Sequence, residues 1–297
     1  MESMDTKQKI RRFFIYRYQL LARIDPEKPQ FVYMTPERSY MNVDDLKSDK
    51  NRIFWNMLKD IKFKWPYAEI SHEIVFSDEE TCLIRMGVNR PTVLRTEDFK
   101  SVFTNDWPWI YIFVDNNPNN QFLVVEIERE AWDSPDITIN MLSRNINDYL
   151  SNYYLVTEIE PIIEKNAFWE FVDKHKGQIK MVEFDMISPN MSNISEKSVW
   201  PLREIRDQYN ATRQKVRLEN TAGSSIAVKK DKLIVSMADY SLSGGGKTRF
   251  KLKGIRGYKS LSDDKISIEF DDIDVEIDDP KKFREIANIL LNLVRKL

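Results

Sequence analysis

The chain has 297 residues, a formal net charge of −2 and an apolar fraction of 42%. This composition indicates a globular protein of one large or two ordinary domains and excludes long disorder. No apolar run approaches the roughly 18 residues that a membrane helix needs, and the first residues lack the apolar core of a signal peptide. With one cysteine, Cys82, no internal disulfide can form. We therefore expect a cytoplasmic protein without membrane insertion.

The first half of the chain alternates between strand and helix patterns. Apolar residues with partial alternation predict a strand over 12–24, and one-sided apolar spacing predicts a helix over 48–61. Thr96 is expected to cap a short helix through Phe103. The turn-forming run 115–121 predicts a hairpin of strands 109–114 and 122–128. Further elements are expected as strands over 72–76, 81–86 and 154–159 and as helices over 134–153 and 166–175, the first of which should begin with Ser134 as its N-cap.

The second half contains a similar mixture. Strands are expected over 178–187 and 212–219, and helices over 199–211, 231–242 and 280–297. Residues 248–253 and 266–270 alternate apolar and charged side chains, which is typical of two strands of one sheet with a solvated face.

We therefore predict an α+β fold with two mixed α/β domains. Residues 1–176 would form an N-terminal α+β domain. Residues 177–297 would form a C-terminal α+β domain, a small antiparallel sheet covered by helices, with a basic strand and a terminal amphipathic helix.

Charge is segregated near the C-terminus. Residues 229–259 hold seven lysines and two arginines against two aspartates, whereas residues 261–279 hold nine acidic residues and one lysine. Such segregation creates a field that a mixed surface would not have, and it indicates a binding face.

The basic block is the candidate binding site. Lys247, Arg249, Lys251 and Lys253 alternate along one predicted strand and should share one face. A row of cations releases counterions from a phosphate backbone, and this release favours binding. We therefore predict a nucleic-acid surface, for DNA or RNA. The candidate residues are Lys229, Lys230, Lys247, Arg249, Lys251, Lys253, Arg256 and Lys259. The alternative is that the strand pairs with an acidic strand around Glu269, Asp271 and Asp272 and forms cross-strand ion pairs.

Other patterns give weaker candidates for chemistry. Residues 241–248 resemble a phosphate-binding loop, but Ser241 stands where the pattern needs glycine, and a helix precedes the loop instead of a strand. Helix termination by glycine before a mobile loop explains them better. Glu126 and Glu128 could hold a divalent metal for nuclease chemistry, although solvated acids on a hairpin strand are the simpler interpretation.

The histidines exclude more than they suggest. His72 and His175 have no second ligand at metal-site spacing, so a Cys/His zinc site is disfavoured. A histidine general base would also have no companion pattern. We therefore expect no metal, no cofactor and no catalytic residue, which favours a non-enzymatic protein.

A resemblance to a known group lies in the second half. The run VEFDMISPN at 182–190, followed by WPLREIRDQYNATRQKVRLENTAGSSI at 200–226, a helix, a glycine-broken loop and an acidic strand, resembles the RexA-like phage-exclusion group of bacterial anti-phage defence proteins. The resemblance implies an intracellular sensor that binds DNA, forms a dimer and acts with a second protein that carries the toxic activity. It contains no catalytic signature, so no site residue carries over.

Our first functional hypothesis is therefore a non-enzymatic component of bacterial antiviral defence, which binds nucleic acid or a phage product and acts with an effector partner. The alternatives are a metal-dependent nuclease and a protein-interaction subunit that does not bind nucleic acid. Ile289 and Leu291 lie off the apolar stripe of the last helix and imply a second contact, either against the N-terminal half or across a two-fold dimer. We expect a homodimer, since two-fold dimers are the commonest soluble oligomers.

Overall fold

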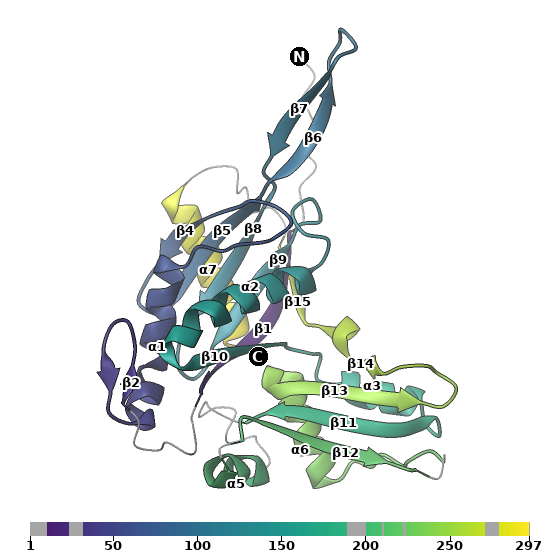
Figure 1. The fold of residues 1–297 in the computed structure, drawn as a ribbon. Coiled ribbons are helices and arrows are strands. Elements are labelled where there is room, and N and C mark those ends of the chain that lie inside the picture. The colour runs from purple at the N-terminus through teal and green to yellow at the C-terminus, as the bar shows by residue number, and fades with distance from the viewer. Residues whose placement is uncertain are drawn as a thin grey trace.

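The structure is a computed structural model that describes residues 11–23, 32–188, 200–209, 211–221, 224–270 and 279–296. Its main elements are a large and a small antiparallel sheet, each covered by helices (Figure 1). The predicted α+β fold with a small antiparallel sheet is therefore confirmed.

The large sheet has the strand order β10-β1-β9-β8-β5-β4, and β15 pairs with β1 on the same edge as β10. The strands are β1 Arg11–Ala22, β4 Ile70–Ser77, β5 Thr81–Val88, β8 Trp109–Asp115, β9 Phe122–Ile127, β10 Leu155–Pro161 and β15 Ser267–Phe270. Strand β1 is buried on both faces from Ile15 onwards, which explains why apolar residues occupy both of its faces and why Arg17 and Gln19 need partners inside the fold.

Helices cover both faces of the large sheet. α1 (Val43–Asp60) and α2 (Pro135–Leu150) pack on one face against Tyr16, Tyr18 and Leu20 of β1. The Asn42 side chain accepts from the Asp45 amide to begin α1, and Ser134 caps α2 as the sequence predicts. α7 (Pro280–Val294) packs on the other face against Phe13 and Ile15. Among the described residues, no helix is both long and apolar enough to cross a membrane.

The small sheet has the order β12-β11-β13-β14. Its strands are β11 Ile179–Ile187, β12 Arg213–Glu219, β13 Gly246–Leu252 and β14 Lys259–Ser260, and the nearby helices are α3 Ala167–Lys174, α5 Trp200–Tyr209 and α6 Lys232–Tyr240. α3 and α6 share one core with the sheet, and within it Phe168 lies 5.6 Å from Phe184 and 5.5 Å from Phe250 between ring centroids. The opposite face of the sheet carries charged side chains. The remaining elements are β2 Tyr33–Met34, β3 Ser39–Tyr40, β6 Arg90–Arg95 and β7 Ser101–Asp106, with short turns of helix at Ser151–Tyr153, Ser241–Gly245 and Ser262–Asp264.

The packing crosses the predicted domain boundary at residue 176 in both directions. α3 precedes the boundary but belongs to the core of the small sheet, whereas β15 and α7 follow it and return to the large sheet. The expectation that strand 266–270 pairs with strand 248–253 is wrong, because β15 pairs with β1. The reason is that the second face of the large sheet is apolar and needs α7 to cover it.

The predicted helix from Thr96 to Phe103 is also wrong, because this segment is part of the β6–β7 hairpin. Thr96 lies in the hairpin turn, where the Thr96 amide donates to the Lys100 carbonyl at 2.9 Å. The hairpin projects away from the body of the protein as an arm of residues 90–106 (Figure 1). The β-branched residues Thr92, Val93 and Val102 favour a strand over a helix here.

A glycine turn at 241–246 joins the small sheet to the large one. The Ser243 carbonyl accepts from Arg17 Nε at 2.8 Å, and the Gly244 carbonyl accepts from Gln19 Nε2 at 3.3 Å. Gly244 has φ +80°, and a Cβ there would lie 2.6 Å from the Arg17 Cβ. Only glycine allows this approach. The expected mobile loop is therefore a buried turn that contacts β1, although its helix–glycine–strand order confirms that it is no phosphate-binding loop.

We predict that Gly244→Ala lowers the free energy of unfolding far more than Gly254→Ala. Both glycines have positive φ, +80° and +76°, but a methyl group at Gly254 would meet no atom within 4 Å. Gly254→Ala should cost about 1–2 kcal/mol for the left-handed backbone. Gly244→Ala adds the clash with Arg17, which should cost about 1–3 kcal/mol more. Urea unfolding of both variants measures the difference, and equal losses would show that the turn does not need close contact.

Candidate functional site

Strand β13 presents its cations on the face of the small sheet that faces away from α3 and α6. Phe250 and Leu252 point into the shared core. Lys247, Arg249 and Lys251 therefore project from the opposite face, as the alternation predicts, and they are exposed or half-buried.

Acidic side chains from the neighbouring strands neutralise part of this ladder. Lys247 Nζ lies 3.4 Å from Glu160 Oε1 on β10, and Arg249 lies 3.5 Å from Glu183 Oε1 on β11. The alternative prediction named Glu269 as a partner of the basic strand, and this is wrong, because Glu269 on β15 lies 3.5 Å from Arg12. Asp271 and Asp272 lie outside the described residues. The basic strand thus forms ion pairs within the fold, but with β10 and β11.

Arg213 on β12 connects the two sheets through a cluster of buried acids. Its guanidinium donates to Asp185 at 2.8 Å, Glu158 at 3.0 Å and Glu160 at 3.4 Å. Burial opposes ionisation of Asp185, but the hydrogen bond from Arg213 and the charges of Arg213 and Lys215 outweigh it and lower the pKa of this carboxyl. Burial raises the pKa of Glu160, against the charges of Lys247 and Arg213. The cluster therefore stabilises the contact between β10 and the small sheet.

We predict that Arg213→Met destabilises the protein by about 2 kcal/mol or more, because it leaves buried carboxylates without their cation. Arg217→Met, four residues along the same strand, should leave stability close to that of the parent, because within the described chain Arg217 forms an ion pair with the exposed Glu219 alone. Chemical unfolding at neutral pH compares the two variants. Equal stability of both would contradict the structural role of the Arg213 cluster.

The exposed end of the β13–β14 hairpin keeps its charges unneutralised. Lys251, Lys253, Arg256 and Lys259 are exposed, and among the described residues no acidic group lies within ion-pair distance of them. Positive φ at Gly254 and Gly257 turns the chain, and Tyr258 is 55% exposed between the cations. We refer to residues 251–259 as the basic loop.

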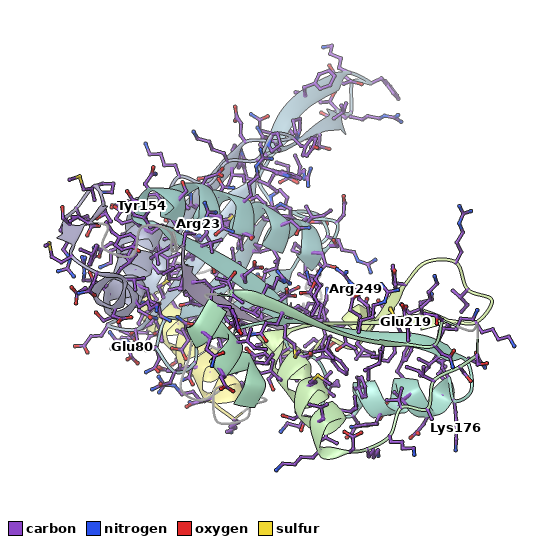
Figure 2. All side chains as sticks on the ribbon, turned by 60° about the horizontal axis from the view of Figure 1, so that its bottom comes forward. Arg23, Glu80, Tyr154, Lys176, Glu219 and Arg249 are labelled. Atoms are coloured by element: carbon purple, nitrogen blue, oxygen red, sulfur yellow. The ribbon has the colours of Figure 1, made fainter. Side chains whose placement is uncertain are left out.

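Lys229 and Lys230 do not join the other candidate residues on the outer face. Lys230 Nζ lies 5.1 Å from the ring centroid of Trp169 on α3, which packs on the helix-covered face of the sheet. Figure 2 shows this separation, with Arg249 on one side of the strands and Lys176, just past the end of α3, on the other. The structure thus brings six of the eight candidates onto β13 and the basic loop and leaves these two apart.

Glu126 and Glu128 do not form a metal site. Glu126 is 2% exposed, and its two oxygens accept from Arg11 at 2.7 Å and from the Tyr111 amide at 2.8 Å. Within the described residues no group of three histidine, cysteine or acidic side chains could hold a metal ion. The simpler interpretation as solvated acids is also wrong for Glu126, because Arg11 pairs with it inside the fold.

Sequence reasoning missed a cavity at the junction of the two sheets. It has a volume of about 420 Å³ and lies between the beginning of α2, β10, the glycine turn and β13. Lys247 and Arg249 line it, together with Tyr16, Glu160 and Lys265. No local pattern could have indicated it, because its walls come from segments that are far apart in the chain.

Exposed apolar residues gather on the β6–β7 arm. Phe99 at its tip is 99% exposed and Phe103 is 80% exposed. The pair Val93–Phe103 lies on one face of the hairpin and the pair Leu94–Val102 on the other. Each face therefore presents apolar side chains to solvent, which is unusual for a two-stranded ribbon without a core.

Comparison with known proteins adds no family: no family model, no curated protein and no solved structure matches this chain significantly. The resemblance to phage-exclusion proteins therefore stays a prediction.

Proposed function

We propose that the protein binds the phosphate backbone of nucleic acid with its basic loop. The observation that carries this proposal is the contrast within the basic block. Lys247 and Arg249 have acidic partners in the fold, whereas Lys251, Lys253, Arg256 and Lys259 extend into solvent without one among the described residues. Unpaired cations on a projecting loop gain most from phosphate, because counterion release from the nucleic acid drives the association.

The composition of the loop supports backbone contact without sequence readout. No helix lies in the loop that could enter a major groove, so its cations would contact phosphates, which carry no base code. The exposed ring of Tyr258 offers a surface on which an unpaired base can stack. We therefore propose non-sequence-specific binding, with a preference for single strands.

The setting that we propose comes from the sequence resemblance. The protein would be a cytoplasmic, non-enzymatic component of bacterial anti-phage defence that acts with an effector protein. The paired and buried state of Glu126 argues against the alternative of a metal-dependent nuclease built on that residue.

We predict that the triple substitution Lys253→Ala, Arg256→Ala and Lys259→Ala weakens binding of short DNA and RNA oligonucleotides at least about tenfold at low salt. It should also lower the slope of log Kd against log salt concentration by roughly one per lost cation. Fluorescence anisotropy across a salt series measures both quantities.

The matched control for the loop variant is Lys47→Ala, Lys62→Ala and Lys64→Ala. These exposed lysines lie at α1 and just beyond it, and their loss changes the net charge equally. If the loop variant keeps the affinity and salt slope of the parent, or if the control loses as much, the basic loop is not the binding surface.

We propose as a second candidate function that the β6–β7 arm contacts another protein chain. The exposed apolar pairs on both of its faces favour this. A second copy of this chain is the proposed occupant, because the sequence resemblance implies a dimer. Leu291 on α7 packs against the core of the large sheet, so its contact is with the N-terminal half, the first of the two expected alternatives. Ile289 is 42% exposed, as expected.

We predict that Phe99→Ser with Phe103→Ser converts a dimeric parent into a monomer while the fold survives, because neither side chain belongs to a core. Ile289→Ser is the control on α7 and should leave the dimer intact. Light scattering after size exclusion gives the mass. A monomeric parent, or a dimer that only Ile289→Ser disrupts, would contradict the proposal.

A further inference from the structure

The junction cavity combines an apolar wall with a polar one. Ile139 of α2, Ile159 of β10 and Leu242 of the glycine turn form part of its apolar lining. The polar lining comes from β1, β10, the glycine turn and β13. Its volume of about 420 Å³ lies within the range of small-molecule sites, which combine apolar walls with a few polar groups that fix orientation.

Four residues that line this cavity each hold a buried polar atom without a hydrogen-bond partner among the described residues. These atoms are the hydroxyls of Tyr16, Ser241 and Thr248 and the Oε2 of Glu160. Each of these residues is at least nine-tenths buried, with exposures of 1%, 3%, 7% and 1% in that order. A buried polar group without a partner costs free energy, so four in one cavity indicate that something else supplies the partners.

Cations surround the same space. Lys247 and Arg249 line the cavity from β13, and their ion pairs with Glu160 and Glu183 are long, at 3.4 and 3.5 Å. Lys265 has an 8% exposed side chain and lies on the opposite wall, where it pairs with Asp136 and sits 6.0 Å from the Tyr16 ring centroid. Each of the three cations thus has a carboxylate partner, Glu160, Glu183 or Asp136, and the local charge is balanced. The two long pairs leave Lys247 and Arg249 able to donate to an anion in the cavity.

We propose that the junction cavity binds a small phosphorylated molecule that carries hydroxyl groups, of the size of a sugar phosphate or a mononucleotide. The phosphate would lie against Lys247 and Arg249, whose side chains can donate charge-assisted hydrogen bonds to its oxygens. The ligand hydroxyls would donate to Glu160 Oε2 and exchange hydrogen bonds with Tyr16, Ser241 and Thr248. This inference does not rest on nucleic-acid binding by the basic loop.

The competing explanation is that ordered water alone satisfies the four atoms, since a polar cavity of this size can hold water. The two explanations differ in what happens when a hydroxyl is removed. A hydroxyl bonded to fixed water contributes to stability without ligand, so its loss destabilises the free protein. A hydroxyl that awaits a ligand is a cost in the free protein, so its loss leaves stability unchanged or raises it.

The experiment therefore combines calorimetry with thermal unfolding on the full chain. The probes are AMP, ribose 5-phosphate, inorganic phosphate and adenosine. Thr248→Val and Ser241→Ala should weaken binding of the phosphorylated probes about tenfold each while the Tm of the free protein stays the same or rises. If ribose 5-phosphate and AMP both bind, the site recognises the sugar phosphate. If AMP binds and ribose 5-phosphate does not, the site also recognises the base.

Lys247→Met and Lys62→Met form the matched pair for charge. Both lysines are exposed, but Lys62 lies just beyond α1 and does not line the cavity. Lys247→Met should abolish the preference for AMP over adenosine, and Lys62→Met should retain it. The proposal is overturned if neither AMP nor ribose 5-phosphate binds the parent at millimolar concentration. It is also overturned if the hydroxyl variants bind the phosphorylated probes as tightly as the parent does, whether or not the Tm of the free protein falls.

Discussion

The close contact between the glycine turn 241–246 and β1 fixes the position of each candidate site on the small sheet. Two backbone carbonyls of the turn accept from Arg17 and Gln19, whose side chains are at most 9% exposed. Strand β13 begins where this turn ends, so the contact determines where its cations lie relative to β10. The junction cavity also lies beside this turn, because Ser241, Leu242 and Gly246 form one of its walls. A larger residue at Gly244 would clash with the Arg17 side chain and disturb this contact.

Charge segregation in the sequence does not translate directly into charge segregation on the surface. The described part of the acidic block returns to the large sheet with β15, so it does not face β13. The acids that do face β13 are dispersed along the chain, at Glu160 on β10 and Glu183 on β11. They neutralise the beginning of the basic block and leave its end free of acidic partners among the described residues. Within the described part of the basic block, this end, the basic loop, therefore offers the exposed and unpaired cations that favour contact with a nucleic-acid backbone.

Local signals in the sequence predicted the elements, whereas long-range pairing had to come from the structure. The Ser134 cap and the apolar stripe of α7 each lie within one segment, and both are confirmed. The destination of α7 was missed because nothing in its own residues tells which of two sheets it covers. The β6–β7 arm was missed because its apolar residues have no core to reveal their periodicity. The cavity was missed because its walls are far apart in the sequence, and Tyr16 and Thr248 come together only in the folded chain.

Two equally buried glutamates show how a structural charge differs from a candidate binding group. Glu126 and Glu160 are 2% and 1% exposed, and burial raises the pKa of both. Both oxygens of Glu126 accept short hydrogen bonds. Among the described residues, Glu160 has two long contacts at 3.4 Å, both through Oε1, and its Oε2 has no partner, although the residue lines the cavity. Folding alone selects for the first arrangement, because it satisfies each buried atom. The second retains an unsatisfied acceptor beside Lys247 and Arg213, and the ligand that we propose would recover that cost.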